Sequence, residues 1–226
     1  MSLLRQLQTI TERTYQRASG VNLERFVIGP HRYRFLSDRS DTSTAQLSDM
    51  ARTFLRVADD RLYLAIYYSD RMIEVLEQYD PRRGLHQKNI YAFTVFIEEL
   101  NHAIHAALKF LAGQRNIYAE TFLRDLELLA KVDCYHTLKY FMAYFNPSQQ
   151  LEEWDRLWLR HHLFEGWEYD YASERLSTRY SETNHLGKKY TRFLDSLKPD
   201  SRVAEIRRFR EMPYPRKREY IRFLPN

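Results

Sequence analysis

Two predicted helices in this sequence carry a histidine and a carboxylate where an apolar stripe would otherwise continue. These residues are Asp133 and His136 in the helix 117–145, and His162 and Glu165 in the helix 149–178. The stripes recur at alternating steps of four and three residues, the spacing of one helix face. Buried carboxylates are costly unless they are paired, hydrogen-bonded or bound to a metal. The pattern therefore predicts a polar site inside a helical core.

A further group lies in the predicted helix 88–112. Glu99 has the apolar neighbours Val95, Ala103 and Ala106, so it is expected to face the core. Glu98 and His102 share an arc with other polar residues, which is typical of a solvated face with a pair four residues apart. Counting residues from each predicted turn nevertheless places Glu99 at the same height in the bundle as the polar residues of the later helices.

Carboxylates with histidines one helical turn away can present oxygen and nitrogen ligands together to Fe or Mn, and also to Zn. The predicted metal ligands are Glu99, His102, Asp133, His136, His162 and Glu165, with Asp70, His161 and Glu98 as weaker candidates. Two alternatives stay open: a buried polar network that only fixes the register of the helices, and a pocket for an organic ligand. The sequence does not decide whether the protein is an enzyme.

The segment Glu99-x-x-His102 resembles the Glu-x-x-His motif of the ferritin-like diiron-carboxylate proteins. That family places a carboxylate one helix before the motif, where Asp70 stands here. The second half reads Asp133-x-x-His136 and then, in reversed order, His162-x-x-Glu165. The resemblance implies a diiron or dimanganese oxidoreductase that acts with dioxygen or peroxide on a small-molecule substrate. Heme-oxygenase-like diiron oxidases use a similar ligand set in a helical bundle.

Composition and helix breakers favour a helical globular chain. The length of 226 residues suits one domain, and 44% hydrophobic with 29% charged residues argue against disorder. Only six glycines and seven prolines occur, and they leave long runs free of helix breakers. The expected fold is all-α: a four-helix up-down bundle with additional N- and C-terminal helices.

The expected single domain, 1–226, divides into a core bundle, 44–178, an N-terminal helix and arm, 1–43, and C-terminal helices with a basic tail, 181–226. The four bundle helices are predicted at 44–79, 88–112, 117–145 and 149–178, the last with a kink near Gly166. Shorter helices are predicted at 2–18, 181–197 and 201–211, and a hairpin or extended arm at 25–36.

Cysteine usage and hydropathy predict a cytoplasmic protein that does not enter a membrane. The lone Cys134 excludes an internal disulfide and points to a reducing compartment. The N-terminus lacks the apolar core of a signal peptide, and no run reaches the roughly 18 apolar residues of a membrane span.

The tail from Arg202 onward holds the whole net charge of +5 and mixes basic with aromatic residues. Nucleic-acid binders use such mixtures, and binding through this tail is the lesser alternative function. Charge runs more often belong to solvated surfaces or to arms that dock on a partner subunit. The sequence therefore favours a small-molecule substrate over a nucleic-acid partner. It is also compatible with a homo-oligomer.

Overall fold

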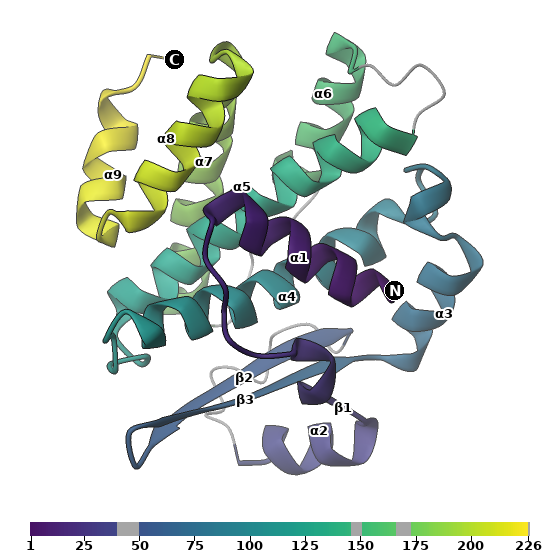
Figure 1. Ribbon diagram of the computed structural model, residues 1–226, viewed down its shortest axis with the longest axis vertical. Helices are drawn as coiled ribbons and strands as arrows, with labels where there is room; N and C mark the ends of the chain where they lie inside the picture. The colour runs from purple at the N-terminus through teal and green to yellow at the C-terminus, as the bar shows by residue number, and fades with distance from the viewer. Residues whose placement is uncertain (40–49, 146–150, 166–172, 226) are drawn as a thin grey trace.

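The computed structural model describes residues 1–39, 50–145, 151–165 and 173–225. Its centre is an antiparallel pair of long helices, α4 (Ile90–Leu111) and α5 (Glu120–Phe145), with a small sheet against α4 and the C-terminal helices against α5 (Figure 1). The other main elements are α1 (Leu3–Tyr15), β1 (Val27–Ile28), α2 (Pro30–Ser37), β2 (Ala51–Ala58), β3 (Arg61–Tyr68), α3 (Asp70–Gln78), α6 (Glu153–Arg160), α7 (Glu174–Ser196), α8 (Pro199–Glu211) and α9 (Tyr214–Phe223).

Most described residues lie in helices, so the predicted predominantly α-helical class is confirmed. The helices α4 and α5 agree to within three residues with the predicted helices 88–112 and 117–145. Among the described helices, none is both long enough and apolar enough to cross a bilayer.

The prediction of one helix over 44–79 is wrong: in the described part of that range two strands come first, and only α3 at its end is helical. Residues 44–49 lie outside the described part, and β2 and β3 form an antiparallel hairpin in which Thr53 faces Ile66 and Leu55 faces Leu64. Asp59 and Asp60 make the two-residue turn with positive φ angles of 51° and 53°. Acidic residues tolerate this conformation, which matches the twist of paired strands. The apolar residues here fit both a helical and an alternating pattern.

One face of the hairpin packs on α4, and two side-chain hydrogen bonds to α4 carbonyls join them. Thr53 Oγ1 donates to the Glu99 carbonyl at 2.9 Å, and the Tyr68 hydroxyl donates to the Phe96 carbonyl at 3.3 Å. On the other face, Tyr33 of α2 stacks on Tyr67 with 3.9 Å between ring centroids. The predicted arm 25–36 is therefore a short strand followed by a helix that covers the sheet.

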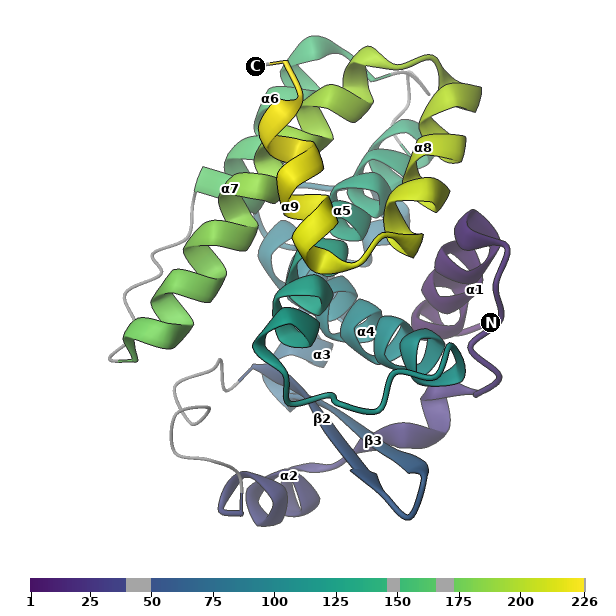
Figure 2. The same cartoon turned by 90° about the vertical axis from the view of Figure 1, so that its left-hand side faces the viewer.

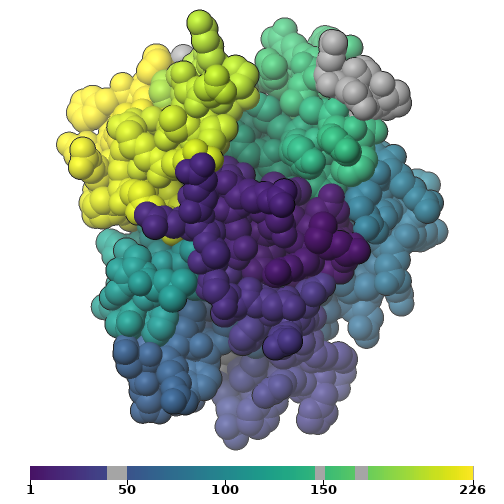
Figure 3. Space-filling model, viewed as in Figure 1, coloured from purple at the N-terminus to yellow at the C-terminus, as the bar shows by residue number. Residues whose placement is uncertain are grey.

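The C-terminal half also differs from its predicted boundaries. The predicted helix 149–178 is divided: α6 continues into one π-helical turn (His161–Glu165), residues 166–172 lie outside the described part, and α7 begins at Glu174. The predicted basic tail contains the helix α9, which starts after Pro213 and packs on α5 and α7. Figure 3 shows the N-terminal segment (purple) in the middle of one face of the molecule, next to these C-terminal helices (yellow).

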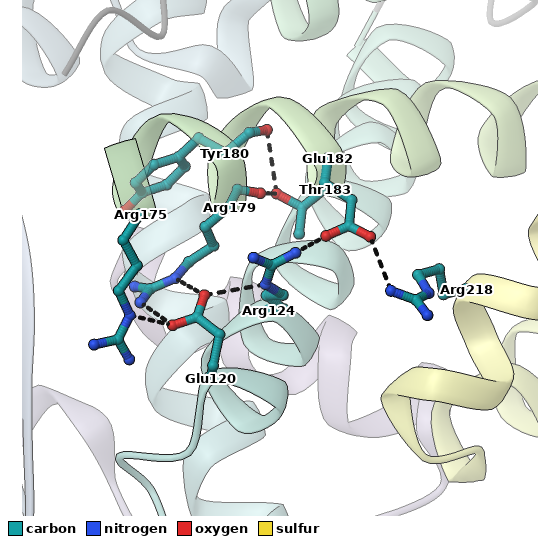
Figure 4. A network of polar contacts seen from close by, with 8 residues as sticks. All are labelled: Glu120, Arg124, Arg175, Arg179, Tyr180, Glu182, Thr183 and Arg218. Carbon is teal, nitrogen blue, oxygen red and sulfur yellow. Dashed lines mark hydrogen bonds and ion pairs between the residues drawn. The ribbon is translucent and has the colours of Figure 1, made fainter. Parts of the chain in front are cut away.

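Polar contacts bind α7 and α9 to α5. Glu120 of α5 accepts hydrogen bonds from Arg124, Arg175 and Arg179, which Figure 4 shows around one carboxylate. The hydrogen bond from Arg179, with help from the other two arginines, outweighs the effect of burial and lowers the pKa of Glu120 to about 2. This end of α7 is therefore held on α5 by a carboxylate that stays ionised.

We expect Gly187→Val to destabilise the protein by about 1 to 3 kcal/mol, because it forces the packing of α7 apart. A Cβ atom at Gly187 would lie 3.3 Å from Lys131 Cβ and 3.3 Å from Phe164 Cε1. Gly29→Val is the matched control, since a Cβ there meets nothing within 4 Å. Urea unfolding measures both variants. Equal stability of the Gly187→Val protein and its parent would contradict this close approach.

Candidate metal centre

The polar residues that meet between α4 and α5 form a small cluster of acids, a histidine and a lysine. Glu98 and His102 are one turn apart on α4, and Glu127 and Lys131 are one turn apart on α5. Because the helices run antiparallel, Glu98 faces Lys131 and His102 faces Glu127. Regular helical spacing on both partners thus brings four chemically active side chains together.

Three of these side chains offer ligand atoms at the spacing of a metal site. One ligand atom from each of Glu98, His102 and Glu127 lies within 4.8 Å of the others. His102 Nε2 is 3.3 Å from Glu127 Oε2, and both atoms are buried. Neither atom makes a well-directed hydrogen bond within the described residues, although buried polar atoms normally have one. The cluster therefore has unused capacity for a ligand.

Electrostatics make His102 the proton-bearing member of the cluster. Burial alone would lower the pKa of His102, but the Glu127 and Glu99 carboxylates outweigh it and hold the pKa well above its ordinary value. Burial alone would raise the pKa of Glu127, but the charges of His102 and Lys131 outweigh it and lower the pKa. An imidazolium therefore faces a carboxylate at neutral pH. A metal cation at His102 would take the place of its proton.

Glu99 lies behind His102 rather than beside Glu127. Its Oε2 atom is 3.7 Å from His102 Nδ1, the ring nitrogen that faces away from Glu127. Carboxylates in this position orient the ring of a metal-bound histidine and raise its basicity. The predicted ligand Glu99 is thus placed to position His102, and Glu98, predicted as a weaker ligand, lies in the ligand cluster itself.

Asp133 belongs to a different buried group. It accepts a 2.5 Å hydrogen bond from the Tyr15 hydroxyl and lies 2.6 Å from His105 Nε2. Burial, more than the opposing effect of Asp133, lowers the pKa of His105, so the ring is neutral and its Nε2–H donates to the carboxylate. Asp133 is satisfied by these partners and ties α1 to the central pair.

The other predicted ligands are dispersed. His136 Nε2 is buried without a hydrogen-bond partner in the described residues, and His162 lies 3.1 Å from Gln87. Glu165 is exposed and pairs with Lys188 at 2.7 Å and with His161 at 3.6 Å. Asp70 is exposed at the start of α3. In the described part of the chain, the six predicted ligands do not form one cluster.

Glu127 and Lys131 are the members of the cluster that are missing from the predicted ligand set, because charged residues at helical spacing usually mark a solvated face. The structure buries them. The expected solvated arc of helix 88–112 is corrected in the same way, since Asn101 and His105 are fully buried. A signal was present: apolar residues occur on every side of 120–145, which is typical of a helix that is surrounded by others.

No family model matches the chain, and neither does any curated protein or solved structure. The site must therefore be interpreted from its own geometry.

Proposed function

We propose that this protein binds one divalent transition-metal ion between α4 and α5, with Glu98, His102 and Glu127 as ligands. The observation that carries the proposal is the convergence of three ligand atoms within 4.8 Å of one another. His102 Nε2 and Glu127 Oε2 support it, because both atoms are buried and face each other at 3.3 Å without a well-directed hydrogen bond in the described residues. Glu98 can keep Lys131 on one oxygen, 2.9 Å away, and coordinate with the other.

One imidazole and two carboxylates suit Mn, Fe or Zn, which accept mixed nitrogen and oxygen ligands. Three protein ligands leave coordination positions open for a substrate. An oxidoreductase reaction with dioxygen or peroxide, the reaction class of the ferritin-like diiron proteins, would need a redox-active ion at this position. We therefore propose Fe or Mn as the native metal, and one metal rather than two.

Elemental analysis of the purified full chain, followed by calorimetric titration with Mn, Fe and Zn, tests this proposal. We expect one ion per chain. His102→Gln and Glu127→Gln should each lower metal affinity by more than about 100-fold, the upper range for residues that only support a ligand. Binding should also release a proton, because His102 must be neutral to coordinate. The proton is measured by titration in buffers of different ionisation enthalpy.

His162→Gln and Glu165→Gln are the matched controls, since they make the same chemical changes at the predicted positions outside the cluster. We expect both to leave metal affinity within about threefold of the parent, as substitutions remote from a site do. The proposal fails if the folded parent carries no metal and none of the three ions raises its melting temperature. It also fails if the control variants lose as much affinity as the cluster variants.

A second candidate is a metal-free network that fixes the register of α4 and α5, one of the alternatives predicted from the sequence. The observation that favours it is that the buried carboxylates already have cationic or protonated partners: Glu98 with Lys131, Glu127 with His102, Asp133 with His105, and Asp125 with Lys109. In that case Glu127→Gln changes the free energy of unfolding, and metal ions change nothing.

A further inference from the structure

The C-terminal helices carry a larger net positive charge than the whole chain does. Between Glu174 and Phe223 the sequence holds 14 lysines and arginines against seven aspartates and glutamates, while the net charge of the chain is only +5. Figure 2 shows α9 and α7 next to each other on the face turned toward the viewer. The excess charge is thus concentrated on one part of the molecule.

Several of these basic side chains are used inside the fold. Lys217 pairs with Asp125, Arg179 with Glu120, and Arg208 with Glu205, while Arg202 donates to the carbonyls of Leu194 and Leu197. Arg216 and Arg222 differ from them. Both are exposed, and neither forms an ion pair in the part of the chain that the structure describes.

The two arginines lie at an open hollow on the outside of α9. The hollow has a volume of about 560 Å³, and its lining consists of Pro213, Pro215, Arg216, Arg218, Glu219 and Arg222. Arg218 is directed by Glu182 of α7, 3.7 Å away, at the end of the network in Figure 4. Three guanidinium groups therefore line the hollow together with the Glu219 carboxylate, and the Glu182 carboxylate faces one of the three.

The basic surface continues from α9 onto α7. Lys189 Nζ donates to the Arg222 carbonyl at 3.1 Å, which places this lysine at the C-terminal end of α9. His185 and Arg192 lie one turn on either side of Lys189, and both are exposed. We call the two neighbouring sets of basic residues the α7–α9 surface. It is formed by His185, Lys189, Arg192, Arg216, Arg218 and Arg222.

We propose that the α7–α9 surface binds the phosphate backbone of a nucleic acid. Guanidinium groups bind phosphate oxygens in a bidentate manner, and a row of them matches a polymer that carries a phosphate at every nucleotide. The helix is rigid enough to present them, because Tyr214, Lys217 and Ile221 on its inner side are buried. Phe223, 84% exposed at the end of the row, offers a ring on which an unpaired base can stack.

Charge and apolar pattern favour nucleic acid over an anionic membrane. A helix that lies in a membrane interface needs a broad apolar face directed at the lipid. The apolar residues Tyr214 and Ile221 of α9 are directed into the protein core instead. Only Phe223 would be left to enter a bilayer, so the surface fits a hydrated polyanion better than a lipid.

Fluorescence anisotropy with a labelled single strand and a labelled duplex, each of about 20 nucleotides or base pairs, tests the proposal over a range of salt. The probe is mixed with the full chain. We expect affinity for at least one probe to fall linearly with salt on logarithmic axes. Arg216→Ala with Arg222→Ala should weaken binding by about tenfold and reduce the salt slope by about two, because two phosphate contacts are lost.

The control is Arg61→Ala with Arg71→Ala, which removes the same charge from exposed positions on β3 and α3. It should change affinity by less than about twofold, as distant surface charges are screened by salt. Equal losses in both double variants would overturn the proposal, as would the absence of salt-sensitive binding to either probe. Binding to phosphatidylserine vesicles without binding to either nucleic acid would also overturn it. Failure of metal binding has no bearing on this test, which needs no metal.

Discussion

Asp125→Asn should lower the free energy of unfolding by about 3 to 5 kcal/mol, the loss that follows when one partner of a buried ion pair is removed. Asp125 of α5 is 3% exposed and lies between two buried lysines, Lys109 of α4 and Lys217 of α9. Lys217 Nζ is 2.6 Å from Asp125 Oδ1 and fully buried, and this burial lowers its pKa to about 8 despite the carboxylate. The substitution would leave two buried ammonium groups without a counter-charge.

Urea unfolding measures this loss, with Asp38→Asn as the control at an exposed aspartate. We expect the control to stay within about 0.5 kcal/mol of the parent, as surface changes usually do. Hydrogen exchange should show that α9 loses protection first in Asp125→Asn, because Lys217 attaches that helix to α5. Replacing all three groups, by Lys109→Met, Asp125→Leu and Lys217→Met, should restore most of the stability. A loss below about 1 kcal/mol in Asp125→Asn would contradict a charged, dry triad.

The second large effect is a loss of stability in acid that depends on His136. Burial, with a smaller contribution from the charge of Lys139, lowers the pKa of His136 to about 4. In the unfolded chain the pKa returns to about 6.5, so between these values the unfolded state binds the extra proton. Stability from this group is therefore complete above pH 6.5 and is lost as the pH falls toward 4. The loss amounts to about 3 kcal/mol by pH 4.

His136→Phe keeps a ring of similar shape and removes the titration. We expect the free energy of unfolding of the variant, measured in urea between pH 7 and pH 4, to decrease by about 3 kcal/mol less than that of the parent. Tyr140→Phe, at an exposed ring one turn further along α5, is the control and should follow the parent curve. Parallel curves for His136→Phe and the parent would contradict the prediction, because they would show that folding does not change the pKa of His136.

Both predictions concern α5, and the metal proposal depends on the same helix. Its inward side supplies Asp125, Glu127, Lys131 and Asp133, which pair with partners from α1, α4 and α9. A metal test must therefore separate affinity from stability. Glu127→Gln is suited to this purpose because it keeps the volume of the side chain, and its unfolding curve without metal gives the structural contribution separately.

Nucleic-acid binding by the α7–α9 surface should depend on how firmly α9 is held on the core. If Asp125→Asn releases α9 from the core, Arg216 and Arg222 are no longer presented on a fixed helix. Nucleic-acid affinity should then fall in Asp125→Asn although no exposed arginine has changed. The double variant at Arg216 and Arg222 should lose nucleic-acid affinity without losing stability, because it leaves the buried triad intact.

Local patterns in the sequence were enough to predict the central helices. Long runs without glycine or proline, with apolar residues at helical spacing, predicted α4 and α5 to within a few residues. The same reasoning failed for β2 and β3: Phe54, Leu62 and Ala65 fit one helical stripe, but Leu62 and Ala65 lie on opposite faces of β3. What decides this segment is its contact with α4, together with the Asp59-Asp60 turn.

The interrupted apolar stripe of the predicted helix 117–145 correctly placed Asp133 inside the protein, whereas the stripe of the predicted helix 149–178 misplaced Glu165, which is exposed. Which acids and histidines meet depends on contacts between helices. A helix side that carries Glu98, His102 and His105 resembles a solvated face until another helix covers it with Glu127 and Lys131. The periodicity of a sequence shows which residues share one side of a helix. Whether that side is buried depends on the neighbouring elements that cover it. Here α4 and α5 are covered on nearly all sides, so the polar arcs became the interior and the candidate metal centre.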